Sequence, residues 1–176
     1  PSELLFLSTA DTELAGLAKI WGDRFGKILG LFQSGHLLHP KAAENFVENV
    51  LCKARLAIFR LHGGYGYFPH LLDEISHIKI HGAKTGILVL PGTDEWDPEL
   101  MRFNDYEEPL VHRMFSYFSE GGIENMKLAA DAVELLLQNR KEEFPKALEV
   151  RKFGWIDKSS AAKTKKNQNG RVWLTF

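Results

Sequence analysis

Short runs of apolar residues alternate along the chain with longer segments in which apolar residues recur every three or four positions. The clearest run, Leu56–Leu61, ends at the turn signal His62-Gly63-Gly64. A continuous apolar run of this length, closed by glycine, predicts a strand that is covered on both faces. Comparable runs predict three further strands at residues 4–8, 27–33 and 86–90.

The segments between and after these runs have helical periodicity. Residues 40–54 carry one apolar stripe, and Pro40 stands in the first turn, where a helix tolerates proline. Asp97 followed by Pro98 predicts the start of a short helix, with Asp97 as its cap. Apolar residues at helical spacing predict further helices that include residues 14–21, 71–78, 110–118 and 123–137.

Buried strands that alternate with amphipathic helices indicate an α/β fold, with a parallel sheet between two helical layers. We expect a flavodoxin-like open parallel sheet of about four strands, with flanking helices and a C-terminal helical extension, because a barrel needs eight strands. The sequence predicts one such domain over residues 1–150. Residues 151–176 hold seven Lys or Arg and one acidic residue, and predict a basic polar tail or linker that is poorly ordered.

Composition narrows the classes of function. A net charge of −1 over 176 residues gives no strong field for nucleic acid or an anionic membrane. We find no signal peptide and no run long enough to span a membrane. The single cysteine, Cys52, excludes an internal disulfide and a cysteine-based metal site, and its place in a helix predicts a small buried hydrophobe. We therefore expect a cytoplasmic protein, and Pro1 in place of Met indicates a fragment or a processed product.

Polar residues follow the first predicted strand, at its carboxyl end. In open parallel sheets, ligands bind beyond the carboxyl ends of the strands. Ser8, Thr9 and Asp11 stand there, just before a predicted helix. Two interpretations remain open for them: an anion site at the helix N-terminus, or simple capping of that helix.

A glycine loop follows the third predicted strand. Gly63, Gly64 and Tyr65 begin this loop, which either contacts a ligand or makes a tight structural turn. The loop does not complete the dinucleotide-binding fingerprint, and the chain has no GxxxxGK[ST] motif. We therefore expect no ATP bound through a phosphate loop.

Other polar groups suggest no defined site. The pairs His36/His39 and His77/His81 have spacings at which two histidines could hold a metal, and ordinary surface histidines are the alternative. Neither pair has a carboxylate in a known ligand pattern such as HExxH. The acidic residues within 94–99 predict a solvated loop and helix start. Because no nucleophile stands beside a base, we assign no catalytic residue and no metal ligand.

Four blocks of the sequence resemble, in order and spacing, the N-terminal region of the large subunit of aerobic cobaltochelatases. This is the CobN family, which is related to the large subunit of magnesium chelatase. The blocks are LLFLSTADTEL at 4–14, LLHPKAAENFVENVLCKARLAIFRLHGGYGYFPHLLDEI at 37–75, GILVLPGTDEWDPEL at 86–100 and EEPLVHRMFSYFSEGGIENM at 107–126. The resemblance covers residues 4–146, and His62 and Tyr65 depart from the residues expected in bacterial members.

The resemblance implies ATP-dependent insertion of Co²⁺ into a corrin precursor, hydrogenobyrinic acid a,c-diamide, in cobalamin biosynthesis. In that family the large subunit binds the tetrapyrrole and the metal. AAA+ and von Willebrand-like subunits supply ATP hydrolysis, for which ATP and Mg²⁺ are implied. The implied partners are the remainder of the large subunit, those two subunits and the corrin precursor. No cofactor is assigned to this chain itself, and we expect the isolated chain to be inactive.

The resemblance and the strand ends together predict where a substrate edge would lie. We expect it to be lined by Ser8, Thr9, Asp11, Gly63, Gly64 and Tyr65. Tyr65, Tyr67 and Phe68 could offer aromatic surface to a flat macrocycle, or they could pack as ordinary core. The alternatives are a stand-alone flavodoxin-like binding module, or a scaffold that docks another chelatase segment or subunit without chemistry.

Overall fold

A four-stranded, all-parallel sheet forms the centre of the protein, with the strand order β2-β1-β3-β4. The computed structural model describes residues 2–140 and 144–150. The sheet confirms the predicted open parallel α/β fold, and its order is the one found in flavodoxin-like sheets. The strands are β1 (Leu4–Ser8), β2 (Leu29–Gln33), β3 (Leu56–Leu61) and β4 (Gly86–Pro91).

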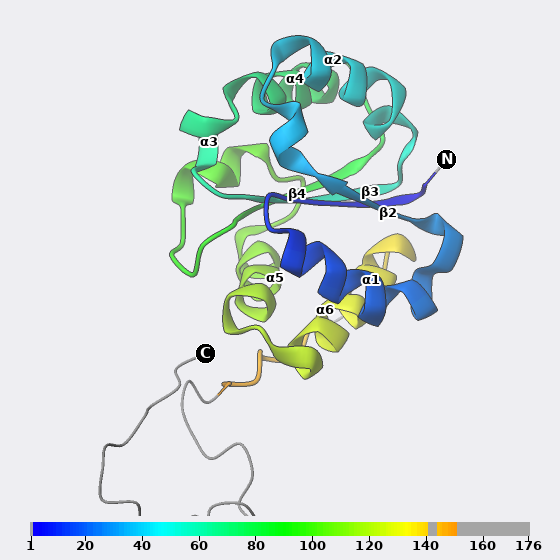
Figure 1. Cartoon of the computed structure of the whole chain (residues 1–176), viewed down its shortest axis with the longest axis vertical. Coiled ribbons are helices and arrows are strands. Elements are labelled where there is room, and N and C mark those ends of the chain that lie inside the picture. The colour runs from blue at the N-terminus through cyan, green and yellow to red at the C-terminus, as the bar shows by residue number, and fades with distance from the viewer. Residues whose placement is uncertain (1, 141–143, 151–176) are drawn as a thin grey trace, which may run out of the picture.

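Helices cover both faces of this sheet (Figure 1). On one face lie α1 (Asp11–Phe25), α5 (Glu108–Glu120) and α6 (Gly122–Leu137). On the other face lie α2 (Pro40–Asn49) and α4 (Pro69–Ile80), and the single turn α3 (Gly64–Tyr67) precedes α4. Helices α5 and α6 are the predicted C-terminal helical extension.

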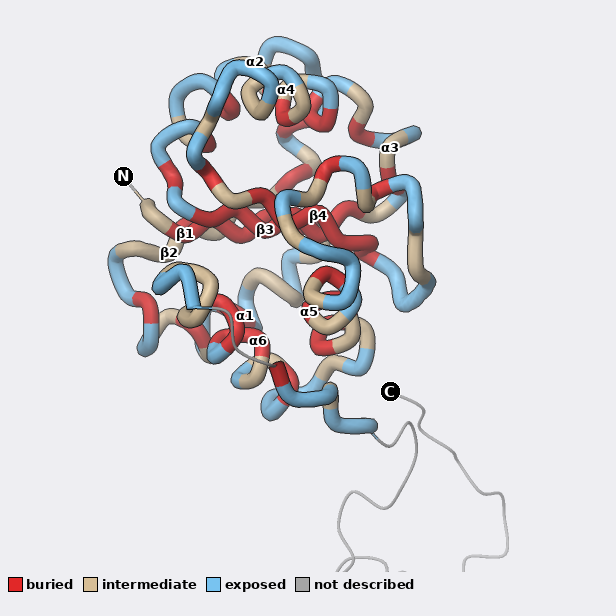
Figure 2. The backbone as a smooth tube through the Cα atoms, turned by 180° about the vertical axis from the view of Figure 1, so that it is seen from behind, coloured by how far each residue is buried: buried red, intermediate tan, exposed pale blue. Residues whose placement is uncertain are grey.

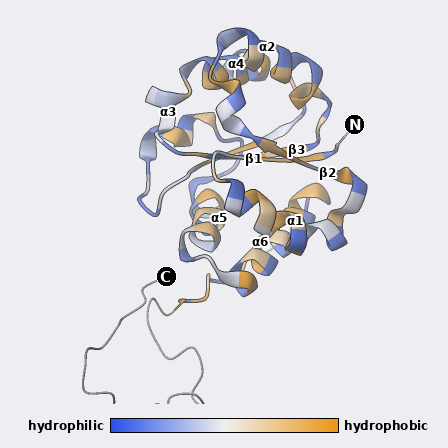
Figure 3. Cartoon of the chain, viewed as in Figure 1, coloured by the Kyte–Doolittle hydropathy of each residue, from blue (hydrophilic) through white to orange (hydrophobic). Residues whose placement is uncertain are grey.

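Two hydrophobic cores lie on the two faces of the sheet. Leu4 and Phe6 of β1 contribute to the core beside α1, α5 and α6, whereas Leu5 and Leu7 contribute to the core beside α2 and α4. Figure 2 shows the strands as a buried band between the helical layers, and Figure 3 shows that hydrophobic residues predominate in that band. Burial on both faces explains why the strands appear in the sequence as continuous apolar runs.

The helix predicted over residues 40–54 ends earlier than expected. Helix α2 stops at Asn49, and a separate 3₁₀ turn follows at Leu51–Lys53. Cys52 lies on this turn and is exposed, so the prediction that it is buried is wrong. The tighter turn changes the direction in which successive side chains point, which removes Cys52 from the apolar stripe.

Two other predicted elements are present with modified bounds. The strand predicted over 27–33 begins only at Leu29, because Gly26–Ile28 form a 3₁₀ turn. The short helix predicted after Asp97 is a 3₁₀ helix over Pro98–Phe103, and the Asp97 carboxylate caps it as expected. The single turn α3 was not predicted.

The basic tail predicted at residues 151–176 lies outside the described residues, so the division at residue 150 stays a prediction. Within the described residues, no helix combines the length and the apolar character needed to cross a membrane.

Candidate functional site

The strand order changes direction between β1 and β3, in the middle of the sheet. From β1 the chain runs outward through α1 to β2, and from β3 it runs outward in the opposite direction through α4 to β4. Open α/β sheets bind ligands at such a switch point, beyond the carboxyl ends of the strands. Ser8 at the end of β1 pairs in register with Arg60 of β3. We call residues 8–11 and 60–65 the switch-point edge.

A hydrogen bond between Thr9 and His62 joins the two halves of this edge. Thr9 Oγ1 lies 2.6 Å from His62 Nδ1, and the Thr9 carbonyl oxygen accepts a hydrogen bond from Gln33 Nε2 at 3.0 Å. The imidazole also lies against the backbone of Gly92, where a Cβ atom would collide with the ring. The ring is therefore held in one orientation. Within the described residues, His62 Nε2 has no hydrogen-bond partner.

Arg60, two residues before His62, is buried and contacts Gly92, the same residue against which the His62 ring packs. Its Nη1 donates to Glu13 Oε1 at 2.8 Å, and its Nη2 donates to the Gly92 carbonyl oxygen at 2.8 Å. Its guanidinium carbon lies 5.4 Å from the centre of the Phe118 ring. Burial lowers the pKa of Arg60, and the neighbouring Glu13 carboxylate partly opposes this effect. Arg60 thus connects α1, the loop after β4 and α5, and it fixes the backbone against which His62 packs.

The glycine loop requires glycine for backbone reasons. Gly63 and Gly64 have φ angles of +86° and +55°, in the left-handed region that favours glycine. A Cβ atom on Gly64 would also come within 2.6 Å of Asp97 Oδ2. These observations support the interpretation of a tight structural turn for both glycines. Contact between this loop and a ligand stays a prediction.

Helix α1 begins without a side-chain cap. Ala10 occupies the N-cap position, and Ser8 Oγ accepts a hydrogen bond from the Ala10 N–H at 3.1 Å, outside the helix. The capping interpretation is therefore wrong for Ser8, and Thr9 is bonded to His62 instead. Asp11 is exposed in the first turn. Its negative charge, with that of Glu13 in the same turn, disfavours an anion at this helix terminus.

The aromatic residues after β3 divide between packing and exposure. Tyr65 stacks on Phe103 with the ring centres 5.9 Å apart, and its hydroxyl donates to Asp73 Oδ1 at 3.1 Å. Phe68 is buried in the core. Tyr67 is 57% exposed and is the member of this group that presents a ring to solvent. Tyr65 and Phe68 therefore follow the core interpretation, whereas Tyr67 is available to a flat ligand.

Several residues of this region were not predicted from the sequence. Arg60 had a detectable signal, because it is the one charged residue in the run Leu56–Leu61. For the others the sequence carried no comparable signal, since their partners lie far away along the chain. The missed residues are Glu13, Gln33, Arg60, His62 and Gly92.

The geometry of the edge supports binding more than catalysis. His62 Nε2 can donate a hydrogen bond to a ligand or accept one from it, while Nδ1 is held by Thr9. In residues 2–140 and 144–150, no three His, Cys, Asp or Glu side chains are placed so that they could hold a metal ion. A ligand at this edge would therefore be recognised by hydrogen bonds and by contact with the exposed Tyr67 ring.

Comparison with known proteins identifies the relatives of this chain. It is 35% identical over 146 residues to the aerobic cobaltochelatase subunit CobN of a Sinorhizobium species, and the match covers 82% of the chain. This chain is homologous to a part of CobN. A second CobN, from Pseudomonas aeruginosa, is 30% identical over 131 residues, or 71% of the chain. The chain spans only 11% and 10% of the lengths of these two proteins. No protein-family model matches the chain.

A solved structure shows the same fold. The catalytic subunit of cobaltochelatase from Mycobacterium tuberculosis superposes with a TM-score of 0.62 over 88% of this chain, at 18% identity. The match takes up 12% of the larger protein. The likeness to CobN predicted from the sequence blocks is therefore confirmed, and the fold of the chain recurs within a cobaltochelatase subunit.

Proposed function

We propose that this chain acts as part of a cobaltochelatase large subunit and that its switch-point edge lines the cavity for the corrin substrate, hydrogenobyrinic acid a,c-diamide. The proposal is supported by 35% identity to a CobN subunit over 82% of the chain. Insertion of Co²⁺, at the expense of ATP, would then be an activity of the whole complex. The chain alone, which spans only 11% of the length of that relative, would not catalyse it.

The observation that carries the role in binding is the hydrogen bond of Thr9 to His62. It lies at the switch point, where open α/β sheets bind ligands. Because Thr9 holds one ring nitrogen, the other is oriented and, among the residues that the structure describes, free for a ligand. The acid and amide groups around a corrin ring are suitable hydrogen-bond partners for that nitrogen. Tyr67 offers an exposed aromatic ring to the flat macrocycle itself.

The partners in this proposal are those of a chelatase complex. They are the remainder of the large subunit, an AAA+ subunit and a von Willebrand-like subunit, with ATP and Mg²⁺ used by the ATPase. Ser8, Thr9, Asp11, Gly63, Gly64 and Tyr65 are proposed to border the substrate, with His62 added on the basis of its geometry. Tyr65 would border it as part of a packed aromatic pair, not as a free ring.

The proposal is tested by titrating the purified chain with hydrogenobyrinic acid a,c-diamide, followed by tryptophan fluorescence and by the absorbance of the corrin. Trp96 is a suitable reporter, because it follows β4 at the carboxyl end of the sheet and stacks on His112 with the ring centres 3.6 Å apart. The informative variant is His62→Ala. Substituting Gly63 or Gly64 would be a poor test, since both have positive φ angles and their loss would strain the backbone.

Saturable binding that becomes about tenfold weaker in His62→Ala, the effect of roughly one hydrogen bond, is the expected result. The matched control is His81→Ala, which removes an exposed imidazole from the end of α4 and should leave the affinity unchanged. Equal loss in both variants, or no binding up to high micromolar concentrations, would refute a substrate edge here.

A docking scaffold is a second candidate function, and one surface feature favours it. Ile123, Leu148 and Val150 are 63%, 52% and 43% exposed. They lie near one another, because Asn125 bonds to the backbone of Leu148 and Val150 lies against Gly122. Exposed apolar groups that cluster in this way mark interaction surfaces. Co-purification with the remainder of the large subunit that is abolished by Ile123→Ser, while corrin binding is absent, would favour the scaffold.

A further inference from the structure

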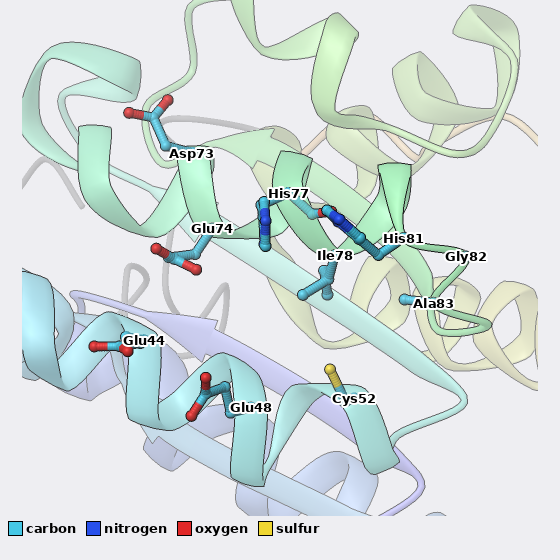
Figure 4. Close-up of a pocket in the computed structure, with 10 residues that line it drawn as sticks. All are labelled: Glu44, Glu48, Cys52, Asp73, Glu74, His77, Ile78, His81, Gly82 and Ala83. Carbon is cyan, nitrogen blue, oxygen red and sulfur yellow. The ribbon is translucent and has the colours of Figure 1, made fainter.

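A groove between α2 and α4 lies on the outer helical layer, and one of its lining residues, Asp73, accepts a hydrogen bond from Tyr65 of the switch-point edge. It has a volume of about 720 Å³ and is bordered by the polar sides of both helices. Figure 4 shows Glu74 and Ile78 extending from α4 toward α2, and Glu48 and Cys52 on the opposite wall. Chemical groups that ligate metals therefore face each other across this groove.

His77 on α4 and His81, which directly follows the helix, form the centre of this arrangement. His77 and His81 are four residues apart at the end of the helix, and their ring centres lie 4.2 Å apart. Two histidines at this spacing on one face of a helix can bind the same metal ion. Both side chains are exposed, so an ion can reach them without any movement of the backbone.

The hydrogen bond of His81 prepares that ring for metal binding. Its Nδ1 lies 2.8 Å from the carbonyl oxygen of His77. A carbonyl oxygen can only accept, so Nδ1 carries the proton and Nε2 keeps its lone pair. Metal-binding histidines are commonly oriented in this way, by donation from the second ring nitrogen to a backbone carbonyl. This contact fixes which nitrogen of His81 carries the proton, which the spacing of the two residues alone does not.

Carboxylates also line the groove that contains the two rings. Glu74 precedes His77 by one helical turn, and Glu48 lies on the facing wall. Neither forms an ion pair within the described residues. Their charges lower the electrostatic energy of a cation in the groove, and a partly exposed glutamate can turn toward an ion at a cost of only side-chain entropy.

We propose that His77 and His81 bind a divalent transition-metal ion in this groove, with a glutamate such as Glu74 as a third ligand. In the described residues, no three ligands converge as they are placed. The third ligand is therefore recruited when the ion binds, and water completes the coordination. Imidazole nitrogen selects Zn²⁺, Ni²⁺ or Co²⁺, whereas Mg²⁺ and Ca²⁺ prefer oxygen ligands. This proposal does not depend on corrin binding at the switch-point edge.

Isothermal titration of the purified chain with Zn²⁺, and separately with Ni²⁺, tests the proposal. We expect binding of one ion that weakens at least about tenfold in His77→Ala and in His81→Ala, since even the loss of an outer-shell partner costs that much. His70→Ala is the matched control, because it removes an exposed imidazole from the first turn of the same helix. His36→Ala tests the other histidine pair in the same way. Neither control should change the affinity.

Three results would overturn the assignment. Equal affinity for Mg²⁺ and Zn²⁺ would show that the carboxylates attract cations without a defined site. Loss of binding in Cys52→Ser, with binding retained in His77→Ala, would assign the ion to the thiol. Unchanged binding in both histidine variants, with circular dichroism showing intact folds, would place the ion elsewhere.

Discussion

Arg60 near the end of β3 and Glu13 in the first turn of α1 form a buried ion pair, with 2.8 Å between Nη1 and Oε1. Only 6% and 17% of the two side chains are exposed. The second carboxylate oxygen of Glu13 and Nε of Arg60 are buried and have no hydrogen-bond partner within the described residues. The pair therefore joins β3 to α1 inside the protein, next to the switch-point edge. Each buried charge is compensated by the other.

Removing one member of this pair should destabilise the fold strongly. In Glu13→Ala, the Arg60 guanidinium would remain buried without its counter-charge, and we expect the free energy of unfolding to fall by about 3–5 kcal/mol. Urea denaturation followed by circular dichroism measures this change. Glu124→Ala is the matched control, because its ion pair with Lys127 is exposed, and such pairs contribute only about 0–1 kcal/mol.

The double variant Arg60→Met with Glu13→Leu separates the cost of an unpaired charge from the value of the pair itself. Apolar side chains of similar volume should recover most of the lost stability, because replacing both buried charges is often nearly neutral. If the double variant were as unstable as Glu13→Ala, the destabilisation would come from lost packing, and the electrostatic explanation would fail.

The hydrogen bond between Thr9 and His62 should contribute measurably to stability. Thr9→Val keeps the shape of the side chain but removes the hydroxyl, and we expect a loss of about 1 kcal/mol. Thr9→Ser keeps the hydroxyl and should retain most of this stability. The comparison is made by urea denaturation of both variants. A larger loss in the serine variant than in the valine variant would show that the methyl group, not the hydrogen bond, stabilises the edge.

The fold could be predicted because each strand carries its own signal. A strand buried on both faces needs apolar residues at successive positions, so β1, β3 and β4 are evident in the sequence. The end of α2 was not evident, because a distant contact sets it. The Thr85 hydroxyl lies 3.0 Å from the carbonyl oxygen of Leu51 and 2.9 Å from that of Ala54. These hydrogen bonds favour a tight turn where the apolar stripe alone predicts more helix.

The location of the candidate site could be predicted, but its internal contacts could not. Glycine and polar residues after β1 and β3 mark strand ends, and the sequence therefore predicts Thr9 and Gly63 at the site. The partners of these residues depend on the order of the strands in the sheet. His62 is 53 residues from Thr9, and Arg60 is 47 residues from Glu13. No local pattern in the sequence connects positions so far apart.

Gly64 should tolerate alanine poorly, whereas Gly66 should accept it. Alanine at position 64 would have to adopt a φ angle of +55° with its Cβ within 2.6 Å of Asp97 Oδ2. The backbone conformation alone costs about 1–2 kcal/mol.

Gly66 has no positive φ angle, and a Cβ atom added there would meet nothing within 4 Å. Gly66→Ala should therefore be neutral or stabilise by up to about 1 kcal/mol. Thermal unfolding of the two variants gives the comparison, and equal melting temperatures would contradict it.

Tyr106 should make stability fall at high pH. Burial, and to a smaller degree the Asp105 carboxylate, raise the pKa of Tyr106 to about 12. In the unfolded chain the phenol ionises near its usual pKa of about 10. Between these values the folded state holds a proton that the unfolded state has lost, so unfolding is increasingly favoured as the pH rises. The part of the unfolding free energy that depends on a protonated Tyr106 is fully present below about pH 10. It is lost between about pH 10 and 12 and amounts to about 3 kcal/mol.

The measurement is the free energy of unfolding as a function of pH, for the natural chain and for Tyr106→Phe. Phenylalanine does not titrate, so the variant should lose less stability between about pH 10 and 12. Burial also raises the pKa of Tyr117, so some loss at high pH should remain in the variant. Tyr117→Phe is therefore the necessary comparison, and the two substitutions should act additively because they remove separate titrations. If the unfolding free energy depended on pH in the same way in the natural chain and in Tyr106→Phe, ionisation of Tyr106 would not destabilise the folded state.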